Sequence, residues 1–595
     1  MKKIVFILLF LITIFAKAQN VQLAYDYFRK GEYQKAASVY EELHLKNKNN
    51  RSYFSQLLRC YQQLNDYSKV EELVLEQQKQ FPRQSYLLVE LGYNYQIQDQ
   101  KEKAIPLYDK ALKTVESKPS SAYLTGRAFQ NHNLLDYALR TYQKAMELKP
   151  KLNFNLYIAN IYGEKGEIGK MFNSFLDMIA INPNYLSTIE RYVAKFITDD
   201  NQNENNILFR KSILKRLQNN PNDSWNKLLS WLYMQQKDYA KALTQEKAIY
   251  KRNGSNLNTI FNIADISFED RNYQTAKDAY IFVIEYAEQT MDVLEAENKL
   301  LKVESFTAKT EEDFNTIENK YQTLLSDYGT GSTTVNTQIN YADFLVFKRN
   351  KPNKAIEILR KAEKVANSRY LLGAIKVKLA DVLVFTDKFN QALITYTQVQ
   401  TDLRGSEIAQ TARLKVAKTS YYKGDFDWAK VQLKVLKAAT SKLISNDALK
   451  LNLLIGDNIA GDTIRTALKK YAKADLLAFQ NKTQAAIDTL NIVLKDFKGH
   501  AIEDEALYFQ AQLFQKQQKF EFAEHNYQKI IQLKKDGILA DDAYYELGQL
   551  YETTLNDKEK AKEMYEKIIF DYANSIFLVE ARKKYRKLRG DKLEE

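Results

Sequence analysis

Three ladders of residues recur along the N-terminal part of the chain with a constant step of 34 residues. The ladders are Ala36, Val70, Ala104 and Ala138; Tyr27, Tyr61, Tyr95 and Phe129; and Tyr40, Val74, Tyr108 and Tyr142. The step stays the same over four units between Lys17 and Leu152. Because a unit this short cannot bury its own apolar face, successive units must stack on one another.

The spacing inside one unit predicts two antiparallel helices. Ala36, Tyr40 and Leu43 stand at i, i+4 and i+7, which places them on one face of a helix. Small residues such as Gly92 and Gly126 fall where that helix must approach its neighbour. Triplets suited to a tight turn separate the two helices: Gly31-Glu32-Tyr33, Asn65-Asp66-Tyr67 and Asp99-Gln100-Lys101.

The length of 595 residues exceeds what one ordinary core supports, whereas a stacked array grows by adding units. Only 18 glycines and 7 prolines are present, far below average usage of about 7% and 5%, which disfavours a fold rich in strands and turns. We therefore predict an all-α fold, a superhelical solenoid of stacked antiparallel helix pairs in two halves.

The repeat register weakens in three zones: near Asn201, from Gln289 to Thr337, and from Ala438 to Thr463. The second zone holds the glycine- and threonine-rich stretch 328–334, which is typical of a hinge. The predicted divisions are an N-terminal array (19–290), an irregular helical connector with the hinge (291–337), a middle array (338–440) and a C-terminal array with a capping helix (441–595).

The first 18 residues have the pattern of an export signal. Lys2 and Lys3 precede the apolar run Ile4 to Phe15, and Ala16-Lys17-Ala18 matches a cleavage site. This predicts a signal peptide over 1–18 and a periplasmic protein, soluble or peripheral to the outer membrane. The single cysteine, Cys60, is expected to be a buried, inert thiol rather than a lipid anchor.

These ladders resemble the tetratricopeptide repeat family. The ending Phe570-Asp571-Tyr572-Ala573-Asn574-Ser575, followed by Glu580-Ala581-Arg582, looks like the envelope-associated subgroup. That subgroup includes the periplasmic accessory protein of the Tol–Pal system and the repeat lipoprotein of outer-membrane barrel assembly. Composition and leader look like those of an exported Bacteroidota-type protein. The resemblance implies a non-catalytic scaffold that binds other envelope proteins or peptides.

No residue pattern in the chain indicates catalysis, and we assign no catalytic residue, metal or cofactor. His500 with Glu503, and Glu521 with His525, share helix faces but lack a third ligand. Gly329-Thr330-Gly331-Ser332 is not followed by the lysine of a phosphate-binding loop. A hydrolase that uses a carboxylate pair in an irregular zone stays open as a third reading.

A fourth ladder lies on the first helix of each unit at positions that do not enter the core. It comprises Tyr25, Arg59, Tyr93 and Arg127, and three residues further on Phe28, Gln62, Gln96 and Gln130. Alternating aromatic and guanidinium groups backed by amides suit a peptide groove on a concave face. The competing interpretation is that these are solvated side chains that stack on each other between units.

The net charge of +13 raises an alternative function. An exported chain rarely meets nucleic acid, so the expected anions are envelope polymers and lipids such as peptidoglycan or lipopolysaccharide. Binding to such a polymer should collapse as ionic strength rises, while a peptide groove should persist. The basic tail Arg582 to Arg589 also suits the end of a helix macrodipole.

Overall fold

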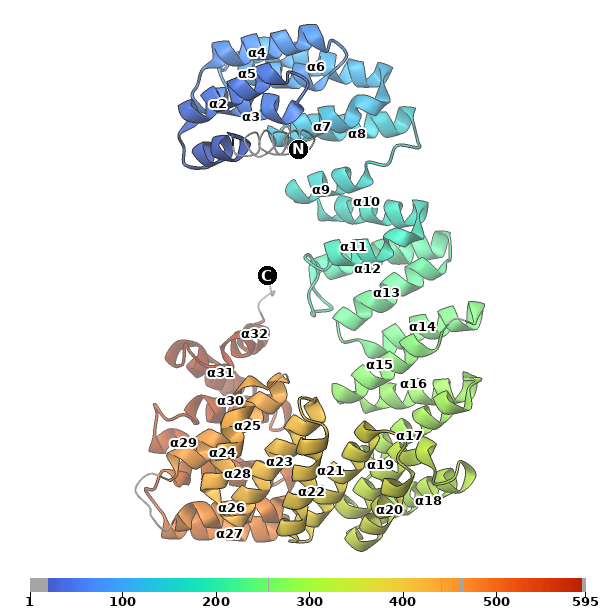
Figure 1. The fold of residues 1–595 in the computed structure, drawn as a ribbon, viewed down its shortest axis with the longest axis vertical. Coiled ribbons are helices and arrows are strands. Elements are labelled where there is room, and N and C mark those ends of the chain that lie inside the picture. The colour runs from blue at the N-terminus through green and yellow to red at the C-terminus, as the bar shows by residue number, and fades with distance from the viewer. Residues whose placement is uncertain (1–19, 255, 440, 460–464, 591–595) are drawn as a thin grey trace, which may run out of the picture. The chain divides into compact units, whose positions relative to one another are not determined.

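The computed structural model describes residues 20–254, 256–439, 441–459 and 465–590. Within these ranges the regular elements are helices, and no strand occurs. Consecutive helices pair in antiparallel fashion and the pairs stack (Figure 1). We call the first helix of each pair A and the second B. The predicted all-α array of stacked helix pairs is confirmed, whereas the predicted signal peptide lies outside the described residues.

The chain forms two compact units, residues 1–249 and 250–595. In the first unit residues 20–29 are helical and are followed by further helices. These are α2 (Tyr33–Lys46), α3 (Arg51–Gln63), α4 (Tyr67–Gln80), α5 (Tyr86–Gln96), α6 (Lys101–Ser117), α7 (Ala122–Asn131), α8 (Leu135–Leu148), α9 (Asn155–Glu164), α10 (Ile168–Ile181), α11 (Leu186–Val193), α12 (Glu204–Asn219), α13 (Asp223–Gln235) and α14 (Tyr239–Asn253).

The second unit begins within α14 and continues the same alternation. Its helices are α15 (Asn258–Glu269), α16 (Tyr273–Tyr286), α17 (Thr290–Thr307), α18 (Glu311–Asp327), α19 (Val335–Phe347), α20 (Pro352–Val365), α21 (Arg369–Phe385), α22 (Phe389–Asp402), α23 (Glu407–Lys423), α24 (Phe426–Val435), α25 (Lys442–Asp457), α26 (Thr466–Phe479), α27 (Thr483–Asp496), α28 (Ile502–Lys516), α29 (Phe520–Leu533), α30 (Ala540–Thr553), α31 (Lys558–Asp571) and α32 (Leu578–Arg589).

Most turns between an A and a B helix contain a residue in the left-handed region. In the first four pairs these residues are 34 apart: Gly31, Asn65, Asp99 and Asn133, with φ of 77°, 56°, 63° and 56°. The next amide then donates back to the aromatic ladder, as Asp66 N does to Tyr61 O at 3.0 Å. The expected tight turns are confirmed. Glycine and asparagine suit them because both tolerate positive φ.

Small residues let the two helices of a pair approach closely. A Cβ atom placed on Gly92 would lie 2.5 Å from Cε1 and 2.8 Å from Cδ1 of Tyr108. Gly126 meets Tyr142 in the same way, and both tyrosines are buried. The repeating small and aromatic residues are therefore the two sides of one packing contact, as the ladders predict.

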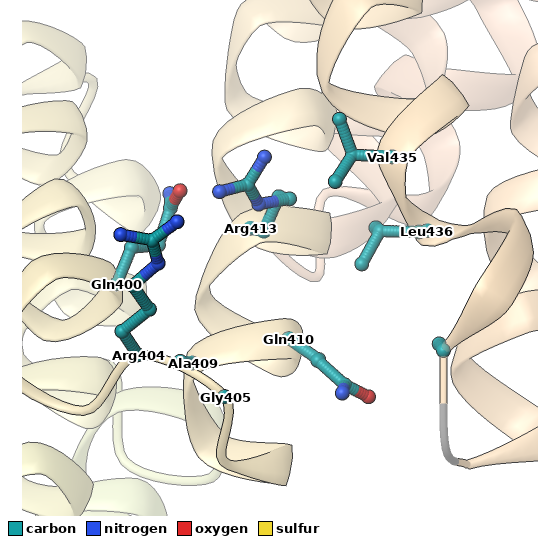
Figure 2. Close-up of a pocket in the computed structure, with 9 residues that line it drawn as sticks. Gln400, Arg404, Gly405, Ala409, Gln410, Arg413, Val435 and Leu436 are labelled. Atoms are coloured by element: carbon teal, nitrogen blue, oxygen red, sulfur yellow. The ribbon is translucent and has the colours of Figure 1, made fainter.

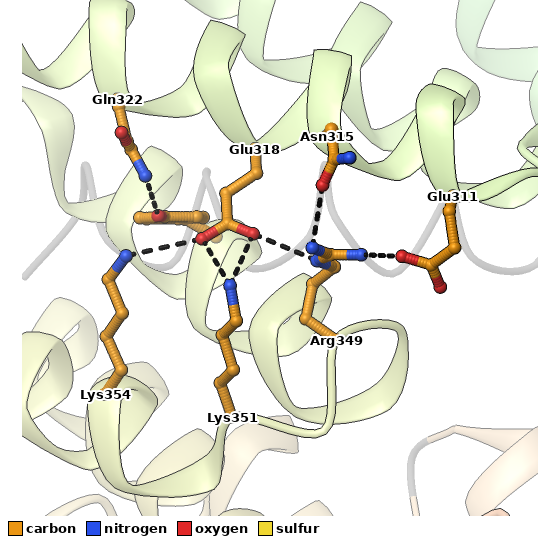
Figure 3. A network of polar contacts seen from close by, with 8 residues as sticks. Glu311, Asn315, Glu318, Gln322, Arg349, Lys351 and Lys354 are labelled. Atoms are coloured by element: carbon orange, nitrogen blue, oxygen red, sulfur yellow. Dashed lines mark hydrogen bonds and ion pairs between the residues drawn. The ribbon is translucent and has the colours of Figure 1, made fainter.

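The zone predicted to contain a hinge is helical and well tied to its neighbours. Glu318 on α18, with a side chain only 8% exposed, accepts hydrogen bonds from Arg349 at 2.9 Å and Lys351 at 2.9 Å, and pairs with Lys354 at 3.3 Å (Figure 3). Arg349 also contacts Glu311 at 2.6 Å. The network joins α18 to the α19–α20 turn, so this zone contributes to the stack.

The loop after α18 is likewise held by hydrogen bonds. The Thr334 hydroxyl donates to Gly329 O at 2.7 Å, and Gln338 Nε2 donates to Gly331 O at 3.3 Å. The division of the chain into two compact units falls between Ile249 and Tyr250, within α14, and the hinge near Gly329 stays a prediction. A glycine-rich composition does not distinguish a hinge from a loop whose carbonyls are capped by neighbouring side chains.

The third irregular zone contains α25. The helix that follows it, α26, does not simply continue the stack but returns to an earlier pair. α26 packs against α23, and its C-terminal turn reaches back to earlier pairs. Gln480 Nε2 donates to Phe385 O at 3.1 Å, and Asn481 Nδ2 donates to Phe347 O at 2.8 Å. The Phe479 ring lies 5.6 Å from that of Phe347. These contacts join residues up to 134 positions apart within the second unit, which a local repeat pattern cannot reveal.

Candidate functional site

The candidate site is the surface presented by the A helices of the first four pairs, which we call the N-terminal A surface. It is formed by residues 20–29, α3, α5 and α7, and carries the fourth ladder. Tyr25 is 45% exposed, Arg59 and Arg127 are exposed, and Tyr93 is half-buried. The ladder thus lies outside the core, at the positions where a partner can reach it.

Arginines on this surface lie over aromatic rings. Arg59 is 5.2 Å from the ring centre of Phe28, and Arg51, at the start of α3, is 4.5 Å from that of Tyr86. Arg127 is 6.0 Å from the Tyr123 ring and donates to its hydroxyl at 3.3 Å. The rings fix the guanidinium groups by cation–π contact. None of these arginines forms an ion pair with another residue that the structure describes.

Tyr93 is engaged with the next pair. Its ring stacks on His132 with centroids 3.7 Å apart and planes 17° apart, and His132 Nε2 shares a hydrogen bond of 2.8 Å with Glu90. Arg59 over Phe28 is also a contact between neighbouring pairs. The structure therefore contains the stacking that the competing interpretation describes, and it leaves the outer edges of the arginines exposed.

The glutamines of the ladder face the core more than solvent. Gln96 Oε1 accepts from the Tyr108 hydroxyl at 2.9 Å, and Gln130 Oε1 accepts from Tyr142 at 3.1 Å. Gln62 Nε2 is buried without a hydrogen-bond partner in the described part of the chain. The arginines and tyrosines of the ladder lie at the surface as predicted, whereas Gln96 and Gln130 accept hydrogen bonds from buried tyrosine hydroxyl groups.

Other aromatic residues belong to the same surface and escaped the sequence pattern. Tyr123 and Tyr157 are 34 residues apart, and their rings meet edge to face at 5.6 Å. The hydrogen bond from Arg127 lowers the pKa of Tyr123. The period could have revealed this pair. The contact of His132 with Glu90 spans 42 residues and follows no repeat, so no sequence signal pointed to it.

Glu90 on α5 adds a carboxylate to this surface. Its side chain is only 14% exposed and is held by His132. The surface therefore combines guanidinium groups, ring faces and one partly buried acid. Such a set can pair with carboxylates and stack on apolar side chains of a peptide.

A small cavity of about 170 Å³ lies in the second unit between α22, α23 and the end of α24 (Figure 2). Arg404 and Arg413 line it together with Gln400, and Val435 and Leu436 form an apolar side. No carboxylate pairs with either arginine among the residues described here. The cavity is too small for more than a single side chain or a small anion.

Cys60 on α3 is fully buried, and burial raises the pKa of its thiol to about 11. The expectation of a buried thiol is confirmed. Within the described ranges no group of three histidine, cysteine, aspartate or glutamate residues is arranged to hold a metal ion. A search of the same residues for a helix both long and apolar enough to cross a membrane finds none.

Comparisons with known proteins agree with the helical repeat at one end of the chain. The tetratricopeptide repeat model matches residues 541–569, within α30 and α31. This repeat is typical of protein–protein interaction scaffolds. No curated protein matches the chain.

Two solved structures align along most of the chain. One is described as Naa15/Naa10 bound to HypK-THB, with 11% identity, a TM-score of 0.30 and 96% of each chain covered. The other is the APC/C hetero-tetramer Cut9-Hcn1, with 14% identity, a TM-score of 0.24, and 96% of this chain and 95% of that chain covered. Scores this low carry no argument about the function of this chain.

Proposed function

We propose that the protein is a non-catalytic scaffold of the bacterial cell envelope that binds partner proteins or peptides on its N-terminal A surface. The matched repeat at 541–569 supports the scaffold class. The envelope location rests on the export pattern of residues 1–18 and on the resemblance of the ending near Phe570 to envelope repeat proteins.

The observation that supports the proposal most strongly is that three arginines are oriented by aromatic rings and left without an acidic partner. Arg51, Arg59 and Arg127 are each oriented by an aromatic ring and have no carboxylate partner among the described residues. A guanidinium group held in this way keeps hydrogen-bond donors directed outward for a carboxylate of a partner. Arginine and tyrosine are also the residues that most often dominate binding energy at protein interfaces.

The alternative function, binding of an anionic envelope polymer or lipid, draws on the net charge of +13. Acidic groups share much of the surface with the basic ones: Lys165 pairs with Asp136 and Glu167, and Lys320 pairs with Glu304 at 2.7 Å. Ion pairs of this kind spread both signs over the array. They favour a discrete protein site over binding through net charge alone.

The test is crosslinking in cells followed by identification of the captured proteins. We expect Arg59→Glu combined with Arg127→Glu to abolish capture, because the reversed charges repel a partner carboxylate. A matched control is Arg83→Glu with Arg140→Glu, which changes the net charge equally on a loop and on a B helix of the same unit. An unchanged partner set in the first variant would refute the N-terminal A surface as the binding site.

A further inference from the structure

A second pocket also lies in the second unit, on the A helices α17, α19 and α21 together with Tyr321 of α18. Its volume is about 340 Å³, twice that of the cavity near Arg404. The lining combines aromatic rings with ammonium groups. The residues are Lys302, Ser305, Phe306, Tyr321, Asn340, Asp343, Phe344, Phe347, Lys348 and Lys378.

Phenylalanine rings form the apolar side of the pocket. Phe344 is buried, while Phe306 is 57% exposed although it packs edge to face on Phe268 at 5.4 Å. Phe347 is held between Phe385 and Phe479 at 5.5 and 5.6 Å. The apolar walls are therefore fixed in place, and one of them remains accessible to a ligand at the mouth of the pocket.

Two of the three lysines lack a carboxylate partner. Lys378 is neutralised by Asp343 and lies 3.8 Å from Asp381. Lys302 and Lys348 line the pocket and form no ion pair among the described residues. Their ammonium groups lie 5.2 Å from the Phe268 ring and 6.0 Å from the Phe314 ring, two rings just outside the lining. The pocket therefore presents two ammonium groups beside exposed apolar surface.

The charge on Lys348 is unfavourable in the free protein. Its partial burial, and then repulsion from Lys516, lower the pKa of Lys348. An anion bound beside Lys348 would offset both the burial and the repulsion from Lys516. Because Asp343 is paired with Lys378, Lys302 and Lys348 are the positive charges left for an anion.

We propose that this pocket binds a segment of a partner protein in which an acidic side chain stands beside a large apolar one. The carboxylate lies between Lys302 and Lys348, and the apolar side chain packs on Phe306 and Phe344. The volume suits one such pair of side chains, and the exposed Phe306 gives an extended segment access. The site is separate from the N-terminal A surface and gives the scaffold a second, chemically distinct contact.

The direct test measures fluorescence anisotropy of the full chain with a labelled, end-blocked peptide, Gly-Ser-Glu-Phe-Gly-Ser. We expect Lys302→Gln with Lys348→Gln to weaken binding about tenfold or more, as loss of charge-assisted hydrogen bonds requires. Lys361→Gln with Lys364→Gln removes the same charge from exposed positions on α20 and should leave the affinity unchanged. Equal affinity in the two double variants, or no binding by the original chain, would overturn the proposal.

Two peptide analogues separate the parts of the proposed ligand. Replacing the glutamate of the peptide by glutamine should weaken binding as much as the lysine changes do, and replacing its phenylalanine by serine should weaken it about fivefold or more. If the serine analogue binds as well as the original peptide, the apolar part of the proposal is wrong.

Competition identifies the source of the anion. Ten-millimolar phosphate should leave most of the peptide bound. Phosphate that displaces it as readily as unlabelled peptide does would assign the pocket to free anions. Vesicles of anionic phospholipid that displace the peptide would assign it to a lipid surface. Either result contradicts the proposal.

A control variant separates this pocket from the N-terminal A surface. Arg59→Glu with Arg127→Glu should retain peptide binding, so failure of this site is distinguishable from failure of the N-terminal A surface.

Chemical labelling gives an independent readout. Because its pKa is lowered, Lys348 should react with an amine-acetylating reagent faster than Lys364. Mass spectrometry should show that saturating peptide slows acetylation of Lys348 and leaves Lys364 unaffected. Acetylation of Lys348 that is unchanged by bound peptide would place the peptide elsewhere and refute the site.

Discussion

Replacing Gly92 by alanine tests the close approach of the two helices in the α5–α6 pair. The added methyl group would lie 2.5, 2.8 and 3.2 Å from three atoms of the Tyr108 ring. Tyr108 is 1% exposed, its ring packs against Phe129 and Tyr137 at 5.6 and 5.2 Å, and its hydroxyl is bound to Gln96. The ring therefore has no free space into which to move.

The expected cost is the balance of two effects. Overpacking a close-packed core costs roughly 1–3 kcal/mol, whereas alanine in a helix gains about 1 kcal/mol over glycine. Three contacts below 3.4 Å with a ring fixed on several sides place the clash near its upper limit. We therefore expect Gly92→Ala to destabilise the α5–α6 pair by about 1–2 kcal/mol.

Hydrogen exchange of the α5 and α6 amides is the suitable assay, because a long array need not unfold in one transition. The control is Gly169→Ala on α10, where an added Cβ meets nothing within 4 Å and stability should rise slightly or stay the same. In a Tyr108→Leu background the further change of Gly92 should cost little. Protection in Gly92→Ala equal to that of the original chain would refute the close-approach argument.

Three further predictions concern the ion network, the buried thiol and the return contact of α26. Burial would raise the pKa of Glu318, but the hydrogen bonds from Lys351 and Arg349 outweigh it and lower that pKa. The ionised Glu318 therefore stabilises the folded state above the unfolded pKa of about 4.3, and this stabilisation is lost as the pH falls through the lower folded pKa. Glu318→Gln should lower the free energy of unfolding, measured by chemical denaturation at pH 7, by roughly 1–3 kcal/mol. An equally large difference in stability between the variant and the original chain at pH 2 would contradict this assignment. Cys60 should react with a thiol reagent at least about 100-fold more slowly than a cysteine introduced at exposed Ser38, and rapid native labelling would contradict its burial. Gln480→Ala should increase hydrogen exchange of the α26–α27 turn by about fivefold to tenfold, because Phe385 O loses its donor; unchanged exchange would show that the contact adds nothing.

The 34-residue period was sufficient to predict most of the helix pairs and turns of the first unit. Ala36, Tyr40 and the turn at Gly31 stand where the ladders require, because each belongs to a contact that recurs in every pair. The period fails where packing partners are distant. Nothing near Gln480 indicates that its turn meets Phe385, and a glycine-rich sequence gives no sign that Thr334 and Gln338 cap its carbonyls.

The candidate site was predictable only in part. The period identified exposed positions such as Arg59 and Arg127, since residues that do not enter the core must face outward. It could not show that Gln96 and Gln130 would be drawn inward by tyrosine hydroxyls, because that depends on side-chain reach across the helix pair. In the lysine pocket of the second unit, Phe306 and Asn340, and Phe344 and Lys378, are 34 residues apart, but the period gives no sign that Lys302 and Lys348 border the same pocket.

We propose that partner proteins bind the N-terminal A surface through its oriented arginines. The most direct measurement is the affinity of a captured partner for the purified chain at 0.05 and 0.5 M salt, with and without Arg59→Glu and Arg127→Glu. The original chain should retain its affinity within about tenfold at high salt, and the double variant should lose at least about 100-fold at both salt concentrations. Equal affinity of the variant, or collapse of the original chain's binding at high salt, would contradict it.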